Sequence, residues 1–146
     1  MAVEVKIIHF QGVSTPEYQT EGSSGVDLQA NITKSVSLKP LERVLIPTGI
    51  KIEMPTGLEA QIRPRSGLAL KKGITVLNSP GTIDSDYRGE IGVILINHST
   101  VDYEVKSGER IAQLVFSKQE NFHWKNVNYI DSSSRGEGGF GSTGTN

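Results

Sequence analysis

The sequence contains no cysteine, so disulfide bonds and zinc sites built from thiolates are excluded, while the redox compartment stays open. It also contains no block of like charge. With a net charge of -1, it offers no basic face for a nucleic-acid backbone or an anionic lipid surface. We therefore expect neither nucleic acid nor a membrane as a partner.

Long apolar runs are also missing. The longest internal run, residues 91–96, is far shorter than a membrane span, and Glu4 and Lys6 interrupt the apolar stretch at the N-terminus. We expect no signal peptide and no transmembrane segment, with the cytosol as the default compartment and the nucleus or an organelle left open. Neither metal-ligand spacing nor a serine–histidine–acid arrangement is found around the histidines, His9, His98 and His123.

Short apolar segments with a period of two dominate the chain, which is long enough for one domain on one core. Residues 91–96 and 111–116 are more continuously apolar and suit central strands. These patterns predict a β-sandwich or barrel with one helical turn at residues 66–72, which Ser66 would cap and Gly73 would end. The alternating segments are Val26, Leu28 and Ala30; Ile50 and Ile52; Leu58, Ala60 and Ile62; and Val101, Tyr103 and Val105.

The composition divides the chain into a core, residues 1–131, and a glycine- and serine-rich tail, residues 132–146. The tail carries Arg135 and a lone Phe140 among glycines. Glycine amides can surround phosphate oxygens, an arginine can bind them by charge, and a phenylalanine can stack on a base. This order of residues favours a nucleotide lid over a plain flexible linker.

Within residues 81–90, two carboxylates, Asp84 and Asp86, lie with Tyr87 and Arg88 between two glycines, Gly81 and Gly89. Close carboxylates share a cation or raise each other's pKa, and glycine lets the backbone approach a ligand. The segment reads as a functional site, and the alternative is a solvated hairpin tip.

Three further segments carry polar groups that can face a ligand. Residues 64–69 follow a strand and open the expected helix, where amides and the Ser66 hydroxyl can bind an anion; the alternative is an ordinary capped corner. Asp27 lies in an expected strand near a glycine. Its carboxylate either faces solvent or contacts a metal ion or a water molecule. Gln113 is expected to point away from its buried neighbours Ala112 and Leu114.

Taken together and in this order, five segments resemble the motifs of the trimeric dUTP pyrophosphatase (dUTPase) family. The resemblance covers most of the chain, and no motif is missing. The five segments are residues 24–28, 64–69, 81–90, 108–114 and 135–144.

The resemblance implies a jelly-roll-like fold of short, mostly antiparallel strands, a homotrimer, and hydrolysis of dUTP to dUMP and pyrophosphate. Such an activity limits uracil incorporation into DNA and supplies dUMP for dTMP synthesis. By similarity, water attacks the α-phosphorus with Asp84 as the base. The triphosphate carries Mg²⁺, and Asp27 contacts this ion through water.

The same resemblance assigns the substrate-binding residues. The backbone of residues 74–91, with Asn78, would read the uracil edge, Tyr87 would pack on deoxyribose, and Phe140 would stack on uracil. Each active site would combine segments of three subunits. The substrate-binding residues implied are Arg65, Ser66, Gly67, Asn78, Gly81, Thr82, Ile83, Tyr87, Gln113, Arg135, Phe140, Gly141 and Ser142.

Three alternatives remain at this point. A dCTP deaminase shares the fold and the type of nucleotide, but the segment Asp84 to Gly89 resembles the pyrophosphatases. A catalytically silent trimer that senses dUTP is disfavoured by the presence of Asp84. A structural sandwich with a disordered tail would require five coincidental turns. We assign no chemistry to Trp124, which we expect in a last connection or strand before the lid.

Overall fold

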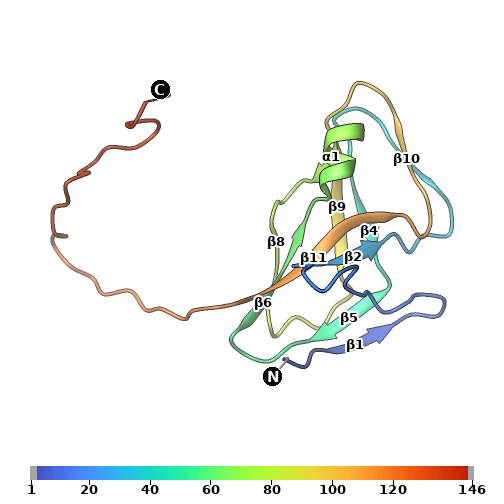
Figure 1. The fold of residues 1–146 in the computed structure, drawn as a ribbon, viewed down its shortest axis with the longest axis horizontal. Coiled ribbons are helices and arrows are strands. Elements are labelled where there is room, and N and C mark those ends of the chain that lie inside the picture. The colour runs from blue at the N-terminus through green and yellow to red at the C-terminus, as the bar shows by residue number, and fades with distance from the viewer. Residues whose placement is uncertain (1–2, 145–146) are drawn as a thin grey trace.

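The structure, a computed structural model, describes residues 3–144, in which the regular elements are short strands and one helix (Figure 1). The strands form a body on one side of the molecule. The chain then leaves this body as a long extension that ends far from it (Figure 1). The predicted all-β fold with one short helix is confirmed.

A four-stranded antiparallel sheet carries many of the predicted site residues. Strand β11 pairs along one side with β2 and along the other with β6, and β6 in turn pairs with β8. Strands β2 and β8 are therefore the two opposite edges of this sheet. The bounds are β2 Val26–Gln29, β11 Arg110–Lys118, β6 Leu58–Arg63 and β8 Gly81–Ile83.

The remaining strands form a three-stranded sheet of order β4-β9-β7 and two antiparallel ribbons, β1-β5 and β10-β3. The central position of β9 and β11 confirms the prediction made from their continuous apolar runs. Their bounds are β4 Arg43–Pro47, β9 Gly92–Asn97, β7 Ile74–Val76, β1 Lys6–His9, β5 Ile50–Glu53, β10 Tyr103–Val105 and β3 Val36–Leu38.

One apolar core joins these sheets. Burial alternates along β2 and β6, as the period of two predicts. Residues from five strands meet in the core with at most 1% of their surface exposed, namely Leu28, Ile46, Ala60, Leu95 and Ile111. Because strands that lie far apart in sequence share this core, the positions of the loops at their ends are well defined.

The helix α1 spans Ser66–Lys72, as predicted, and Gly73 ends it in the left-handed conformation with φ 65°. The expectation that Ser66 caps the helix is wrong. Arg65 occupies the N-cap position with extended backbone, and no side chain caps the helix. Ser66 is the first helical residue, so its hydroxyl is not used by the backbone in this way.

Two strand expectations differ from the structure. Val101 lies before β10 in a bend, where its carbonyl accepts hydrogen bonds from Asn97 and Ser99, rather than in the strand itself. Strand β4 was not among the segments named from the sequence; its apolar Leu45 is 64% exposed, while the neighbouring Ile46 is buried.

Beyond Lys118 the described chain contains no further strand, and the extension begins before the change of composition at residue 132. Trp124 therefore lies in irregular chain, packed edge-on against Phe122 and 86% exposed. Within residues 3–144, no helix is long and apolar enough to span a membrane.

Candidate active site

A cavity of about 180 Å³ lies beside the edge strand β8. Six residues expected to bind or act on the substrate line it together: Asn78, Gly81, Thr82, Ile83, Asp84 and Tyr87. The remaining lining residues, Ile62, Glu90, Ile91 and Gly92, were not singled out from the sequence. A cavity of this size suits a small planar group better than a whole nucleotide.

The backbone of β8 forms one wall of this cavity. Gly81 is buried against β6, and a methyl group at this position would lie 3.2 Å from Asn78 Nδ2 and 3.3 Å from Ile62 Cβ. A larger residue at position 81 would therefore require Asn78 or Ile62 to shift by a few tenths of an ångström. Since β6 pairs with only one side of β8, the backbone groups on its other side can bind a ligand.

Asp84 begins a tight turn at the end of β8. The backbone amide of Tyr87 donates to the Asp84 carbonyl at 3.1 Å, and Arg88 Nη1 donates to the carbonyls of Ser85 at 2.7 Å and Tyr87 at 3.0 Å. The Asp84 side chain is exposed and borders the cavity, together with a second hollow that Asp86 and Glu59 also line. It is therefore accessible to both water and a ligand.

A second group of predicted residues lies at the other edge of the same sheet. Asp27 on β2 forms an ion pair with Arg65, whose Nε lies 2.9 Å from Oδ1, and its Oδ2 accepts a hydrogen bond from Arg110 Nη1 at 3.4 Å. Arg65 also donates through Nη1 to the backbone carbonyl of Arg110 at 3.1 Å. Both oxygens of the carboxylate are thus engaged, and Arg65 is held from two sides. Arg110 was not assigned a role from the sequence.

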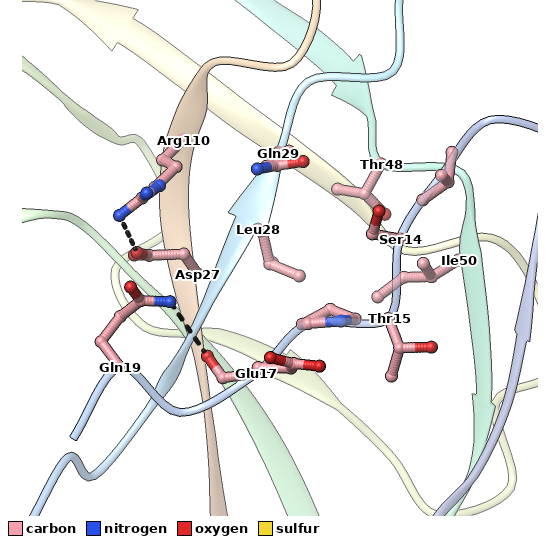
Figure 2. A pocket seen from close by; sticks show the side chains of 12 residues that line it. Ser14, Thr15, Glu17, Gln19, Asp27, Leu28, Gln29, Thr48, Ile50 and Arg110 are labelled. Carbon is pink, nitrogen blue, oxygen red and sulfur yellow. Dashed lines mark hydrogen bonds and ion pairs between the residues drawn. The ribbon is translucent and has the colours of Figure 1, made fainter.

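Asp27 and Arg110 line a hollow of about 320 Å³. Figure 2 shows Ser14 and Thr15 at one side of this site, with the Asp27 and Arg110 side chains next to each other on the opposite side. Gln19 approaches this end of the hollow and donates to the carbonyl of Glu17 at 3.4 Å. The charged groups at this edge are therefore accessible to solvent and to a ligand.

Gln113 joins three of the five sequence segments at this edge. It lies opposite Asp27 on one side and Arg63 on the other, and its Nε2 donates to the Pro64 carbonyl at 3.0 Å. A side chain at Gly25 would come within 3.0 Å of Gln113 Oε1. As predicted, Gln113 is partly exposed while its neighbours in β11 are buried.

Ser66 and Gly67 are exposed in the first turn of α1, next to Arg65. The first amides of a helix have no acceptor within it, so they are free to bind an anion. With the Arg65 guanidinium beside them, these residues form a positively polarised corner.

The predicted residues of the tail lie on the extension, away from the body (Figure 1). The hydrogen bonds of Arg135 and Ser142 stay within the tail: Arg135 Nε donates to the Gly138 carbonyl, and the Ser142 amide donates to Gly139. Phe140 is fully exposed with a positive φ of 47°, and Gly141 follows with φ 88°. In one chain, these residues touch neither of the other two groups.

Metal binding was examined through the donors available. Among residues 3–144, no group of three histidine, cysteine, aspartate or glutamate side chains is arranged to hold a metal ion. The one carboxylate assigned to a metal contact, Asp27, is already paired with two guanidinium groups.

The chain was compared with known families, proteins and structures. The family model described as dUTPase matches residues 11–144. The deoxyuridine 5'-triphosphate nucleotidohydrolase of Fusobacterium nucleatum is 55% identical over 142 residues, covering 97% of each chain. The protein of the same name from Cytophaga hutchinsonii is 55% identical over 144 residues, covering 99% of this chain and 94% of its own.

Solved structures agree with the fold. The dUTPase of Staphylococcus bacteriophage 80alpha, solved with dUpNHpp, superposes with a TM-score of 0.88 at 25% identity and covers 97% of this chain and 99% of its own. A mutant dUTPase of phage phi11, described with a structural Mg(II) ion, has a TM-score of 0.79 at 20% identity. The jelly-roll-like fold expected from the sequence is thereby confirmed.

Proposed function

The chain belongs to the dUTPase family, and on this premise we propose how its three separate groups of residues hydrolyse dUTP. Hydrolysis of dUTP is the activity of its curated relatives, and the chain is a dUTP nucleotidohydrolase that yields dUMP and pyrophosphate. The proposal concerns the roles of individual residues and the assembly that brings them together.

The cavity beside β8 binds the uracil base. Its open strand edge offers backbone donors and acceptors to the base, and Asn78 lines the same cavity. A site that hydrogen-bonds one particular edge rejects bases with another pattern, because buried polar groups would be left unpaired. Tyr87, at the same cavity, packs on the deoxyribose and excludes a 2'-hydroxyl.

Asp84 is the general base. Its carboxylate is exposed at the border of the base-binding cavity, where the α-phosphate of a bound nucleotide comes near. A carboxylate held within about 3 Å of a water molecule can orient it and remove its proton as it attacks phosphorus. The bond between the α-phosphorus and the bridging oxygen then breaks, and pyrophosphate leaves.

Arg65, Ser66 and Gly67 bind the triphosphate. The guanidinium of Arg65 supplies charge, and the first amides of α1 supply donors. Asp27 holds Arg65 in place by their 2.9 Å ion pair, and Arg110 balances the second oxygen of that carboxylate. Gln113 extends the polar surface of this edge.

Mg²⁺ is the proposed cofactor and arrives on the triphosphate. When bound, it would supply neutralisation of phosphate charge, and Asp27 would contact it only through water. The absence of a three-ligand cluster among the described residues fits this arrangement. Direct coordination by the protein is not part of the proposal.

A homotrimer unites the three groups. In one chain, the phosphate-binding edge and the base-binding edge are the two opposite edges of one sheet, with two strands between them. The tail, with Arg135, Phe140, Gly141 and Ser142, contacts neither edge. We expect a neighbouring subunit to supply the missing edge and a third to close its tail over the nucleotide, with Phe140 stacked on uracil.

One observation carries the proposal: six residues selected from the sequence line one cavity at an open strand edge, with the candidate base Asp84 at its border. The test is pyrophosphate release with Mg²⁺ from dUTP, dTTP, dCTP and UTP in parallel, with identification of the nucleotide products. We expect rapid release from dUTP alone, leaving dUMP. Deamination of dCTP, or binding of dUTP without release, would contradict the proposal and favour a deaminase or a silent sensor.

A further inference from the structure

The loop that carries Asp84 and Tyr87 is attached to the body at a turn that belongs to none of the five sequence motifs. This turn joins β4 to β5. Thr48 donates to the Ile91 carbonyl through both its hydroxyl, at 2.6 Å, and its amide, at 3.2 Å, and the Ile91 amide donates to Ile50 at 2.9 Å. Thr48 is only 2% exposed. The end of the loop is thus fixed to the core.

Glu90, the residue before Ile91, adds a side-chain bond to the same turn. The Gly49 amide donates to Glu90 Oε1 at 2.8 Å in partly buried surroundings. Gly49 has φ 71°, and a side chain there would lie 2.6 Å from Asn31 Nδ2 and from Val13 Cγ2. Its amide therefore has a defined direction. A hydrogen bond from a fixed amide to a carboxylate is among the stronger kinds in proteins.

The backbone of Glu90 makes the second connection, to Tyr87. The Tyr87 hydroxyl donates to the Glu90 carbonyl at 3.0 Å. The ring lies directly over Gly89, where a methyl group would come within 3 Å of its outer atoms, Cε2, Cζ and the hydroxyl oxygen. The ring is thus folded back on the loop. Its orientation depends on the position of residue 90.

We infer that Glu90 is a positioning residue that sets the place of the Tyr87 ring and so controls discrimination between deoxyribose and ribose. Its carboxylate is bound to the turn at Gly49 and its carbonyl to the Tyr87 hydroxyl. Loss of the carboxylate bond leaves residue 90 held to the body only through the backbone bonds of Ile91, so residue 90 and the ring bound to its carbonyl shift by a small amount. Space for a 2'-hydroxyl then opens. The inference rests on the proposed role of Tyr87 at the sugar.

The test compares kcat/KM for dUTP with kcat/KM for UTP in the full-length protein, in Glu90→Ala and in Glu90→Gln. The ratio of kcat/KM for dUTP to kcat/KM for UTP should fall roughly fivefold in Glu90→Ala. This is the size expected for partial loss of a charge-assisted hydrogen bond. In Glu90→Gln this ratio should stay within about twofold of its value in the unmodified protein, because the amide oxygen of the glutamine accepts the same hydrogen bond. If only the charge of Glu90 mattered, Glu90→Gln would lower the ratio as Glu90→Ala does.

Two further variants keep the test decisive. Glu90→Asp shortens the side chain and breaks the bond to Gly49 while keeping the charge, so its ratio should fall as in Glu90→Ala, and it serves if the alanine variant does not fold. Tyr87→Ala removes the ring and should lower the ratio most. Thermal melting of every variant separates a general loss of stability from a change in selection.

The outcomes are distinguishable. If Tyr87→Ala lowers the ratio but Glu90→Ala and Glu90→Asp leave it unchanged, the inference is overturned while the proposed function stands. The inference is also overturned if the Glu90 variants lose activity on dUTP and UTP equally with a lower melting temperature, since that indicates a merely structural role. If Tyr87→Ala leaves the ratio unchanged, the proposed sugar contact fails, and the inference fails with it.

Discussion

The body and the extension of this chain differ in how their side chains are used. In the body, apolar residues of distant strands share one core, and its two buried polar residues, Thr48 and Asn97, are hydrogen-bonded. In the extension, Phe122, Trp124 and Ile130 are each at least 76% exposed. One region folds on its own contacts, and the other has few contacts to fold on.

This difference bears on the proposed division of the active site. The body provides the preformed cavity beside β8 and the Asp27–Arg65–Arg110 cluster, whereas the extension carries Arg135 and Phe140 with only local hydrogen bonds. Preformed groups bind without an ordering cost, while a mobile segment must lose entropy when it closes. The extension is therefore suited to a lid that orders only with nucleotide and neighbouring subunits in place.

The largest effect should come from the body. Asp84→Asn should keep nucleotide binding yet lose roughly a hundred- to ten-thousand-fold in turnover, because the amide cannot take a proton from water. This corresponds to about 2.7 to 5.4 kcal/mol of barrier. Single-turnover hydrolysis and equilibrium binding of dUTP measure the two effects separately. Near-normal turnover would remove Asp84 from the mechanism.

Removal of the end of the extension should have the second-largest effect on dUTP hydrolysis. A chain truncated before Arg135 should melt at the same temperature as the full chain, since residues 135–144 contribute nothing buried, and should hydrolyse dUTP about a hundredfold more slowly. An unchanged rate would make the tail a simple linker.

The same truncated chain tests whether sites are shared. Co-refolded with full-length Asp84→Asn, it should give activity well above the sum of the two parents, because one subunit supplies Asp84 and another supplies the tail. Each parent refolded alone is the control. Activity equal to the sum would place tail and base on the same chain and contradict the composite site.

Substitution of two exposed aromatic residues of the extension distinguishes base stacking by one ring from a general effect of losing an exposed aromatic side chain. Phe140→Ala should raise KM for dUTP about ten- to a hundredfold, the range that one base-stacking contact supplies. Trp124→Ala, an equally exposed aromatic before the lid, is the matched control and should leave KM within about threefold. Equal effects of the two changes would argue against base stacking by Phe140.

The smallest effect is expected at the phosphate-binding edge. Asp27→Asn should raise KM for dUTP about five- to tenfold, because Arg65 and Arg110 lose the charge that holds them. Glu53→Gln, which breaks the exposed ion pair with Lys6 at 2.8 Å, is the control and should change KM less than twofold. If both variants behave alike, the Asp27 cluster has no special role in binding.

Local sequence patterns predicted those parts of the fold that depend on neighbouring residues. The alternation in β2 and β6, the continuous apolar runs of β9 and β11, and the helix ended by Gly73 all follow from spacing and residue type. The failures are also local in origin. Arg65 rather than Ser66 occupies the N-cap, because the preceding strand and the ion pair to Asp27 keep Arg65 extended.

Contacts between distant segments could not be predicted in the same way. The Arg110–Asp27 pair joins residues that are 83 positions apart, and the bond between Gly49 and Glu90 spans 41. Such pairs depend on which strands lie side by side, and strand order is decided by the whole core rather than by any one segment. The motif resemblance proposed the residues of the site, but only the sheet order shows that one chain places two groups of them at opposite edges of one sheet.

The brevity of β8 has a consequence for solubility. A free strand edge is a template on which other chains can pair and aggregate, and β8 presents such an edge beside the base cavity. With three residues, Gly81–Ile83, it offers too few backbone groups to hold a foreign strand. The same few groups are enough for the edge of a single base, so the proposed role of this cavity is compatible with a sheet edge that stays open to a small ligand and closed to other proteins.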